Sequence, residues 1–196
     1  MQNNPNASLH HNSRWTVPNI LTMVRIVLVP AFVGAFIEQA YTLAFCLFVI
    51  AGITDGLDGY LARTLRQRSR FGALIDPLAD KLLVLTAFFC LAYLDWIPLW
   101  LFALVIGREL LIVCGFLILR MARGDVHSKI VATWDSKLNT LAQMLLILVV
   151  MAAQVLDVPV LFTFGEGLVY VVGGLALFSG GHYIVLGLRV LLSRDK

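Results

Sequence analysis

The sequence has few charged residues: Asp, Glu, Lys and Arg make up only 14% of its 196 residues. A soluble domain usually carries about 25%, so the composition argues against a surface that faces water on all sides. Apolar residues make up 60% of the chain instead. They lie in long runs rather than alternating stripes, which indicates that lipid surrounds much of the chain.

Cysteine is also scarce, and its placement excludes two kinds of site. Cys46, Cys90 and Cys114 fall inside apolar runs without metal-ligand spacing, which argues against a disulfide framework or a cysteine metal site. The first residues lack the basic-then-apolar order of a signal peptide. We expect residues 1–14 to form a polar cytoplasmic tail and residues 15–196 a single membrane domain without an internal repeat.

Six apolar segments have the length that a bilayer requires. They cover roughly 20–38, 41–62, 72–94, 98–120, 138–156 and 166–190, each near the ~20 residues of a membrane helix. Polar residues mark the breaks: Glu38-Gln39 after the first, residues 64–70 after the second, Asp95 to Pro98 after the third, and 122–137 between the fourth and the fifth. Asp157-Val158-Pro159 and a turn at Gly165–Gly167 are expected before the last. The predicted fold class is therefore all-α: a polytopic membrane protein with six transmembrane helices.

Lys and Arg are missing from the three segments that follow spans one, three and five. They gather in the other connections and at the chain ends, at Arg14, Arg63, Arg66, Arg68, Arg70, Arg120, Arg123, Lys129, Lys137, Arg189, Arg194 and Lys196. The positive-inside rule then predicts that both termini and the arginine-rich loops face the cytoplasm. The four tryptophans fall at predicted span edges, as an aromatic belt requires.

Several charges lie where lipid does not tolerate them. Beside the basic Arg25, Lys81 and Arg108, the chain carries four aspartates inside or next to two apolar runs; these are Asp55, Asp58, Asp76 and Asp80. An ionised residue at mid-bilayer costs about 2.5–3.5 kcal/mol on insertion scales, so a cluster needs a reason. The first two aspartates are three residues apart and the second two are four apart, so each pair shares a helix face. A short connection between the two helices lets all four carboxylates converge.

Converging carboxylates repel one another unless cations neutralise them. Hard divalent cations prefer oxygen ligands, and a pair of such ions suits phosphoryl chemistry. The alternative is a set of structural ion pairs with Arg63, Arg68 or Lys81. Gly59 and Gly72 favour the metal site, because small residues let a bulky ligand approach closely.

The aspartates belong to a longer pattern, Asp55-Gly-Leu-Asp58-Gly59-Tyr-Leu-Ala62-Arg63, eight residues, then Gly72-Ala-Leu-Ile-Asp76-Pro-Leu-Ala-Asp80. It resembles the signature of the CDP-alcohol phosphotransferases, D-x-x-D-G-x-x-A-R, eight residues, G-x-x-x-D-x-x-x-D, and every defining position is present. Pro18-Asn19-Ile-Leu-Thr22-Met-Val-Arg25 is similar to the P-N-x-L-T-x-x-R opening of the members that transfer phosphatidyl groups.

The resemblance implies an enzyme that transfers the phosphatidyl group of CDP-diacylglycerol to an alcohol and releases CMP. It implies that Asp55, Asp58, Asp76 and Asp80 bind Mg²⁺ or Mn²⁺, as two ions, and that Asp80 is also the general base. The CDP-lipid would contact Asn19, Thr22, Asp55, Gly59, Ala62, Arg63 and Gly72, although Arg63 is open to a second interpretation as an interfacial positive-inside residue. A homodimer in a bacterial inner membrane, with its active site facing the cytoplasm, is the expected setting.

The acceptor is assigned from two further cations. Arg108, in Gly107-Arg108-Glu109, and Lys137 look similar to family residues that hold the acceptor's phosphate, which indicates a phosphate-bearing polyol. Glycerol 3-phosphate is the first choice and phosphatidylglycerol the alternative; no nucleic-acid partner is expected. The alternative interpretation of Lys137 is an ordinary charged residue in a loop, without a role in binding the acceptor. A pair between Arg108 and Glu109 is disfavoured, because adjacent residues on a helix do not face each other.

Two other classes of membrane protein, transporters and scaffolds, explain the four aspartates less well than an enzyme does. A cation-coupled transporter often shows repeated halves with broken helices, and here the acids cluster in one hairpin. A membrane scaffold has no use for four costly carboxylates within one short stretch.

Overall fold

The computed structural model describes residues 17–64, 72–123 and 134–192. Within these ranges the side chains at 17–22, 55–64, 72–80, 116, 118–123, 135 and 188–192 lie outside the description. The described part consists of six helices: α1 (Val17–Ile37), α2 (Tyr41–Thr64), α3 (Gly72–Tyr93), α4 (Leu99–Arg123), α5 (Trp134–Leu156) and α6 (Pro159–Leu192). The all-α class expected from the apolar runs is confirmed.

The last helix begins earlier than the sequence pattern predicts. α6 starts at Pro159, a residue suited to a first helical position because it needs no backbone donor there, and it continues through the expected turn at Gly165–Gly167. Gly165 is buried, and a Cβ built on it would lie 3.5 Å from Val150 on α5. Gly165 therefore packs against α5, whereas Gly167 is exposed with nothing within 4 Å of a built Cβ, and neither glycine ends the helix. α5 likewise begins at Trp134, inside the polar stretch that was predicted to separate two spans.

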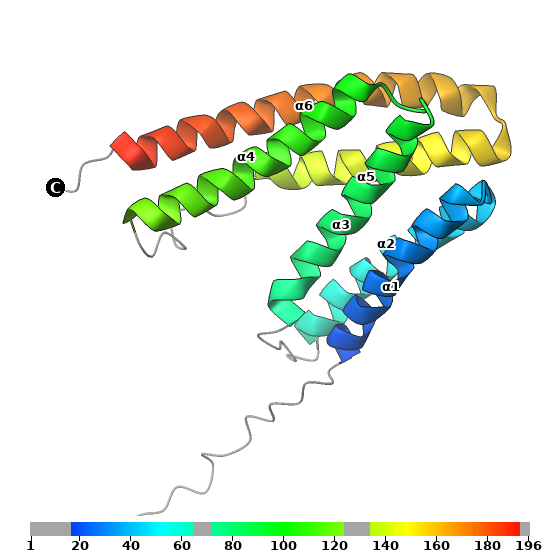
Figure 1. Cartoon of the computed structure of the whole chain (residues 1–196), viewed down its shortest axis with the longest axis horizontal. Coiled ribbons are helices and arrows are strands. Elements are labelled where there is room, and N and C mark those ends of the chain that lie inside the picture. The colour runs from blue at the N-terminus through cyan, green and yellow to red at the C-terminus, as the bar shows by residue number, and fades with distance from the viewer. Residues whose placement is uncertain (1–16, 65–71, 124–133, 193–196) are drawn as a thin grey trace, which may run out of the picture.

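Three short turns join the helices at one end of the bundle, the α1–α2, α3–α4 and α5–α6 turns (Figure 1). Each turn contains one residue in the left-handed region, Gln39 at φ 58°, Asp95 at φ 57° and Asp157 at φ 52°. At the first two turns the next amide donates back across the helix end, Ala40 to Ala35 at 2.9 Å and Trp96 to Leu91 at 2.9 Å. This pattern caps a helix and reverses the chain within a few residues.

Contacts between aromatic rings connect two of these turns. The ring centroids of Tyr41 and Trp96 are 4.9 Å apart, and Phe36 lies 5.5 Å from each of them. The contacts connect the α1–α2 turn with the α3–α4 turn. Offset and edge-on aromatic pairs of this kind each add about 0.5–1.5 kcal/mol beyond the area they bury.

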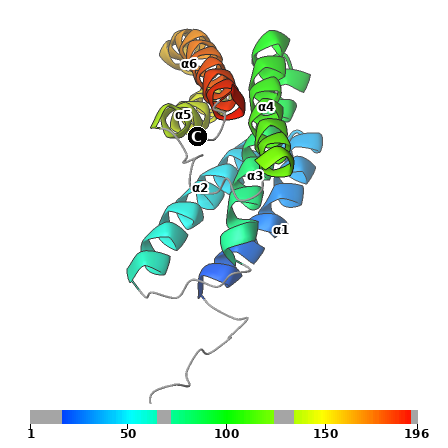
Figure 2. The ribbon, with the colours of Figure 1, turned by 90° about the vertical axis from the view of Figure 1, so that its left-hand side faces the viewer.

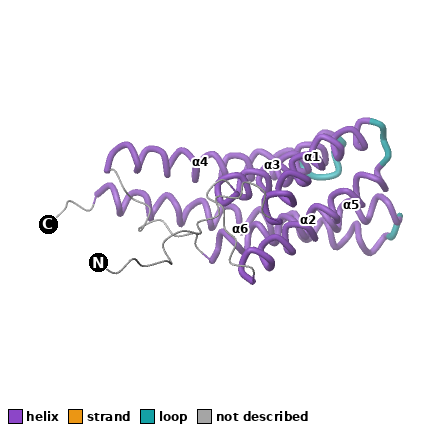
Figure 3. Tube along the Cα trace, turned by 90° about the horizontal axis from the view of Figure 1, so that it is seen from below, coloured by secondary structure: helices purple, strands orange, loops and turns teal. Residues whose placement is uncertain are grey.

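The helices form two groups that differ in direction (Figures 1 and 2). α1 packs against α2 and α3, whereas α6 packs against α5 and α4; α5 joins the groups through its contacts with α2 and α3. Seen from below, all the described chain is helix apart from the short turns (Figure 3). The groups also meet where α3 contacts α4.

Much of the described surface is apolar. Large apolar side chains are exposed on every helix, among them Val27, Leu43, Phe89, Leu110, Leu141 and Phe178, and a surface of this kind suits lipid rather than water. Within the described side chains, two segments are long and apolar enough to cross a membrane, Ser136–Leu156 and Pro159–Gly187. Met23–Ile37, Tyr41–Thr54 and Lys81–Tyr93 are shorter apolar stretches.

Candidate active site

The four aspartates of the signature lie on α2 and α3, toward the end of the bundle that is opposite the three short turns. Asp55 and Asp58 belong to α2 and Asp76 and Asp80 to α3, and the backbone is helical at all four positions. The helical spacing that puts each pair on one face is therefore present. Their side chains lie outside the described residues, as do those of Asn19, Thr22, Gly59, Ala62, Arg63 and Gly72.

Arg108 lies in the interior of the bundle, on α4, with 5% of its surface exposed. Its Nη2 donates to Ser136 Oγ of α5 at 2.6 Å and to Ser179 Oγ of α6 at 3.0 Å. The two hydroxyls hold the guanidinium between α5 and α6. A fixed, buried guanidinium is suited to bind phosphate in the bidentate way that its geometry permits.

Glu109 is the counter-charge of this guanidinium. Arg108 Nη1 donates to Glu109 Oε1, so the prediction that these neighbours do not pair is wrong. The side chains of adjacent residues leave the helix about 100° apart, but both are long enough to bend toward each other. Lys81 Nζ, on α3, lies 2.7 Å from Glu109 Oε2. One carboxylate thus bridges two cations, and Lys81 directly follows Asp80 of the signature.

A cavity of about 320 Å³ opens beside these charges. We call it the Arg108 cavity. Its polar lining comes from all four helices around it, from Lys81, Arg108, Glu109, Ser136, Thr140, Gln143 and Tyr183. Apolar side chains, including Val84, Ile112 and Met144, complete the wall. Two cations against one carboxylate leave a single positive charge in excess among the described lining residues, which favours an anionic ligand.

Two buried amides beside the cavity were missed by the sequence analysis. Gln143 is 2% exposed and lines the cavity, and Asn139, one turn earlier on α5, is fully buried. Gln143 Nε2 and both polar atoms of the Asn139 amide have no hydrogen-bond partner within the described part of the chain. The signal was present in the sequence as two amides four residues apart in an apolar run.

The other two cations singled out from the sequence differ in their surroundings. Arg25, on α1, is 1% exposed. Lys137 is exposed, with its Nζ 5.2 Å from the centre of the Trp134 ring, and it is not among the residues that line the Arg108 cavity. The structure therefore brings Arg108 and Lys81 together and leaves Lys137 outside the cavity.

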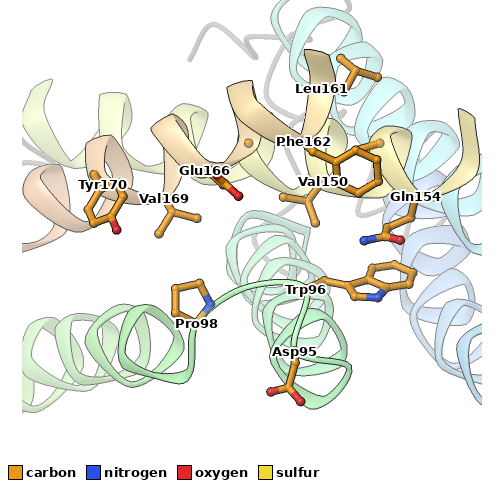
Figure 4. A pocket seen from close by; sticks show the side chains of 12 residues that line it. Asp95, Trp96, Pro98, Val150, Gln154, Leu161, Phe162, Glu166, Val169 and Tyr170 are labelled. Carbon is orange, nitrogen blue, oxygen red and sulfur yellow. The ribbon is translucent and has the colours of Figure 1, made fainter. Parts of the chain in front are cut away.

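A second cavity, the turn-end cavity, lies between the α3–α4 turn, α5 and α6 and has a volume of about 540 Å³ (Figure 4). Its polar residues Asp95, Gln154, Glu166 and Tyr170 are all exposed, and Asp95 points away from α5 and α6. None of its described lining residues is a cation. This larger hollow is therefore less suited than the Arg108 cavity to hold a phosphate.

No three His, Cys, Asp or Glu side chains come together as a metal site in the part of the chain with described side chains. The donor set of the signature nevertheless fits hard divalent ions. Four carboxylate positions on helical backbone, paired at three- and four-residue spacing on α2 and α3, supply the oxygen ligands that Mg²⁺ and Mn²⁺ prefer.

The fold and site define an all-helical protein with an apolar surface and a cavity, lined by the buried Arg108, beside a carboxylate signature. The family model described as CDP-alcohol phosphatidyltransferase matches residues 15–188. The chain therefore belongs to the CDP-alcohol phosphatidyltransferase family.

Its relatives carry two different names. It is 41% identical to the CDP-diacylglycerol–glycerol-3-phosphate 3-phosphatidyltransferase of Haemophilus influenzae over 67% of this chain and 73% of that protein. It is 36% identical to a probable phosphatidylglycerophosphate synthase of Mycobacterium tuberculosis over 83% of each chain, and 34% identical to the human CMP-forming cardiolipin synthase over 76% of this chain. The match spans about half the length of the human and rat cardiolipin synthases, 54% and 55%.

Proposed function

We propose that this protein transfers the phosphatidyl group of CDP-diacylglycerol to glycerol 3-phosphate and releases CMP. The observation that carries the proposal is the Arg108 cavity, in which Arg108 and Lys81 share the carboxylate of Glu109, and Lys81 directly follows Asp80 of the signature in the sequence. A fixed guanidinium and an ammonium can hold the acceptor's phosphate. The adjoining position of Asp80 on α3 then suits the acceptor's hydroxyl.

In the proposed reaction the acceptor oxygen bonds to the phosphorus that carries diacylglycerol. The bond from this phosphorus to the bridging oxygen breaks, and CMP leaves with that oxygen. Asp80 accepts the proton of the hydroxyl, a role that requires hydrogen-bond reach of the acceptor. Divalent ions held by Asp55, Asp58, Asp76 and Asp80 would neutralise the pyrophosphate and the charge on the departing CMP.

The donor is proposed to lie along α1, α2 and α3. The CDP-lipid would contact Asp55 and six further residues of these helices, Asn19, Thr22, Gly59, Ala62, Arg63 and Gly72. Arg63 is the cation of this set, and a phosphate of the donor is its proposed partner. Lys137, exposed near the start of α5, would attract the acceptor from solution rather than bind it inside the cavity.

Phosphatidylglycerol is the second candidate acceptor, with cardiolipin as its product. Two observations favour it: the similarity to cardiolipin synthases, and the single excess positive charge among the described cavity residues. One charge matches a phosphodiester, whereas a phosphomonoester carries nearly two negative charges at neutral pH.

The test is CMP release by the purified protein from CDP-diacylglycerol with Mg²⁺ or Mn²⁺. Glycerol 3-phosphate and phosphatidylglycerol are supplied separately, in vesicles of the same lipid composition. Faster release with glycerol 3-phosphate supports the first candidate, and faster release with phosphatidylglycerol supports the second. No release with either acceptor would exclude the proposed function.

We further propose six membrane spans, a homodimer, and an active site that faces the cytoplasm of a bacterial inner membrane. The three short turns share one end of the bundle and contain no Lys or Arg, as the outer side requires. In a variant without native cysteines, Asp157→Cys should react with a membrane-impermeant maleimide added outside intact cells. Protection of that cysteine would reverse the orientation, and a monomeric mass in detergent would exclude the dimer.

A further inference from the structure

The buried amides of Gln143 and Asn139 lower the stability of the folded protein when nothing is bound to them. A buried amide without a hydrogen bond costs about 1–3 kcal/mol, and three polar atoms of these two side chains have no partner among the described residues. Apolar residues of similar size would avoid this cost. The amides therefore call for a ligand or water that satisfies them.

The Arg108 cavity places the amide of Gln143 where a ligand can reach it, because Gln143 lines the cavity together with Arg108 and Lys81. Asn139 is fully buried and does not line the cavity; it lies one turn earlier on α5, about 40° around the helix. α5 also packs against α2, which carries Asp55 and Asp58.

The amides match a chemical group that both candidate acceptors share. Glycerol 3-phosphate and the headgroup of phosphatidylglycerol are both 2,3-dihydroxypropyl phosphates. In each, one hydroxyl reacts and its neighbour does not, and the neighbour is a neutral donor and acceptor. Amides bind such a hydroxyl without adding charge to a cavity that already holds two cations and a carboxylate.

We propose that the side-chain amide of Gln143 binds the non-reacting hydroxyl of the acceptor, with the buried amide of Asn139 one turn behind it as a positioning group, and so selects a vicinal diol phosphate. This inference rests on the proposed function and assigns the part of the acceptor that Arg108 and Lys81 do not contact. A site built to bind a hydroxyl discriminates strongly against the analogue that lacks it, because its buried polar groups are then left unpaired.

The experiment compares each acceptor with its analogue that lacks the middle hydroxyl. The full-length protein, with CDP-diacylglycerol and Mg²⁺, is given glycerol 3-phosphate or 3-hydroxypropyl phosphate. In a second arm it is given vesicles that contain phosphatidylglycerol or its 3-hydroxypropyl counterpart. Wild type should prefer the diol by at least about tenfold in kcat/KM. CMP release in the first arm identifies the free acceptor as the substrate, and CMP release in the second arm identifies the lipid-borne acceptor.

Gln143→Met and Asn139→Leu remove the amides with little change in size. Each should lower kcat/KM for the diol about tenfold, leave the analogue and the KM for CDP-diacylglycerol unchanged, and keep or raise the melting temperature. Gln154→Met is the matched control, an exposed glutamine on the same helix, and should keep the wild-type preference.

The outcomes separate this inference from the proposed function. Wild type that releases CMP equally fast with the diol and the analogue overturns the inference alone, without reference to any variant. An unchanged diol preference in both variants, with a lower melting temperature, shows structural amides satisfied by water and also overturns it. Absence of CMP release by wild type with every acceptor overturns the proposed function and this inference together.

Discussion

In the half of the bundle away from the short turns, Arg108 is buried, Glu109 is half-buried, and both are bound to neighbouring side chains, whereas the polar residues of the turn-end cavity are exposed. Arg108, Glu109 and Ser179 lie inside the first region, and Lys81 completes their network. At the turns, Asp95 and Glu166 line the larger turn-end cavity, and both are exposed. Charge is costly where it is buried and nearly free where it is exposed. The difference indicates that function lies with the buried network, although its cavity is smaller.

The most direct test of this difference between the two regions is to remove one carboxylate from each. Asp80→Asn should lower kcat for CMP release by about 10³-fold, within the range for loss of a general base, while the melting temperature stays close to wild type. Glu166→Gln, the matched change in the turn-end cavity, should change kcat less than twofold. Retained activity in Asp80→Asn would remove Asp80 from the role of base.

The cations of the acceptor site should show a graded effect. Arg108→Gln should raise the acceptor KM about 30-fold or more, because it removes a charge-assisted, buried contact worth about 2–3 kcal/mol, and leave the KM for CDP-diacylglycerol unchanged. Lys137→Gln should raise the acceptor KM only about threefold, and less at high salt, because an exposed charge is screened. Equal effects of the two substitutions would place Lys137 inside the site.

The same buried charges show how far the sequence could predict the structure. Long apolar runs predicted six helices, and the breaks at Gln39, Asp95 and Asp157 were predicted correctly because polar residues interrupt the runs there. The glycines Gly165 and Gly167 led to the prediction of a turn, but both lie inside α6, where Gly165 is buried against α5. The start of α6 depends on Pro159 and on contacts with α5, which local patterns do not contain.

For the site, helix spacing was sufficient to pair the aspartates but not to find their neighbours. That Ser136 and Ser179 hold Arg108 depends on how α4, α5 and α6 pack, over separations of 28 and 71 residues. The rule that adjacent residues diverge failed for Glu109, because two long side chains bridge the angle. Gln143 and Asn139 have only a weak pattern in the sequence, two amides four residues apart in an apolar run, and their burial is known only from the structure.

The turn half of the bundle is built for close packing, which predicts a defect of stability rather than of chemistry. A Cβ at Gly173 would lie 2.9 Å from Cζ3 of the Trp100 ring on α4. Gly173→Ala should therefore destabilise the protein by about 1–2 kcal/mol, measured as a lower melting temperature in detergent, with little change in KM. Gly174→Ala is the matched control, since nothing lies within 4 Å of its Cβ. If both variants melt at the wild-type temperature, the contact between α4 and α6 is not tight at this point.

The smallest expected effect distinguishes the turns from one another. Gln39 and Asp95 both adopt positive φ, a conformation that costs a residue with a Cβ about 1–2 kcal/mol but that Asp tolerates better than Gln. Gln39→Gly should therefore raise stability by about 0.5 kcal/mol, after the greater freedom of glycine in the unfolded chain is deducted. Asp95→Gly should gain less, and Gln39→Ala should gain nothing because it keeps a Cβ. All three variants should release CMP at the wild-type rate, since these turns lie at the end of the bundle that we assign to packing. A change in acceptor KM caused by Gln39→Gly would contradict that division of the molecule.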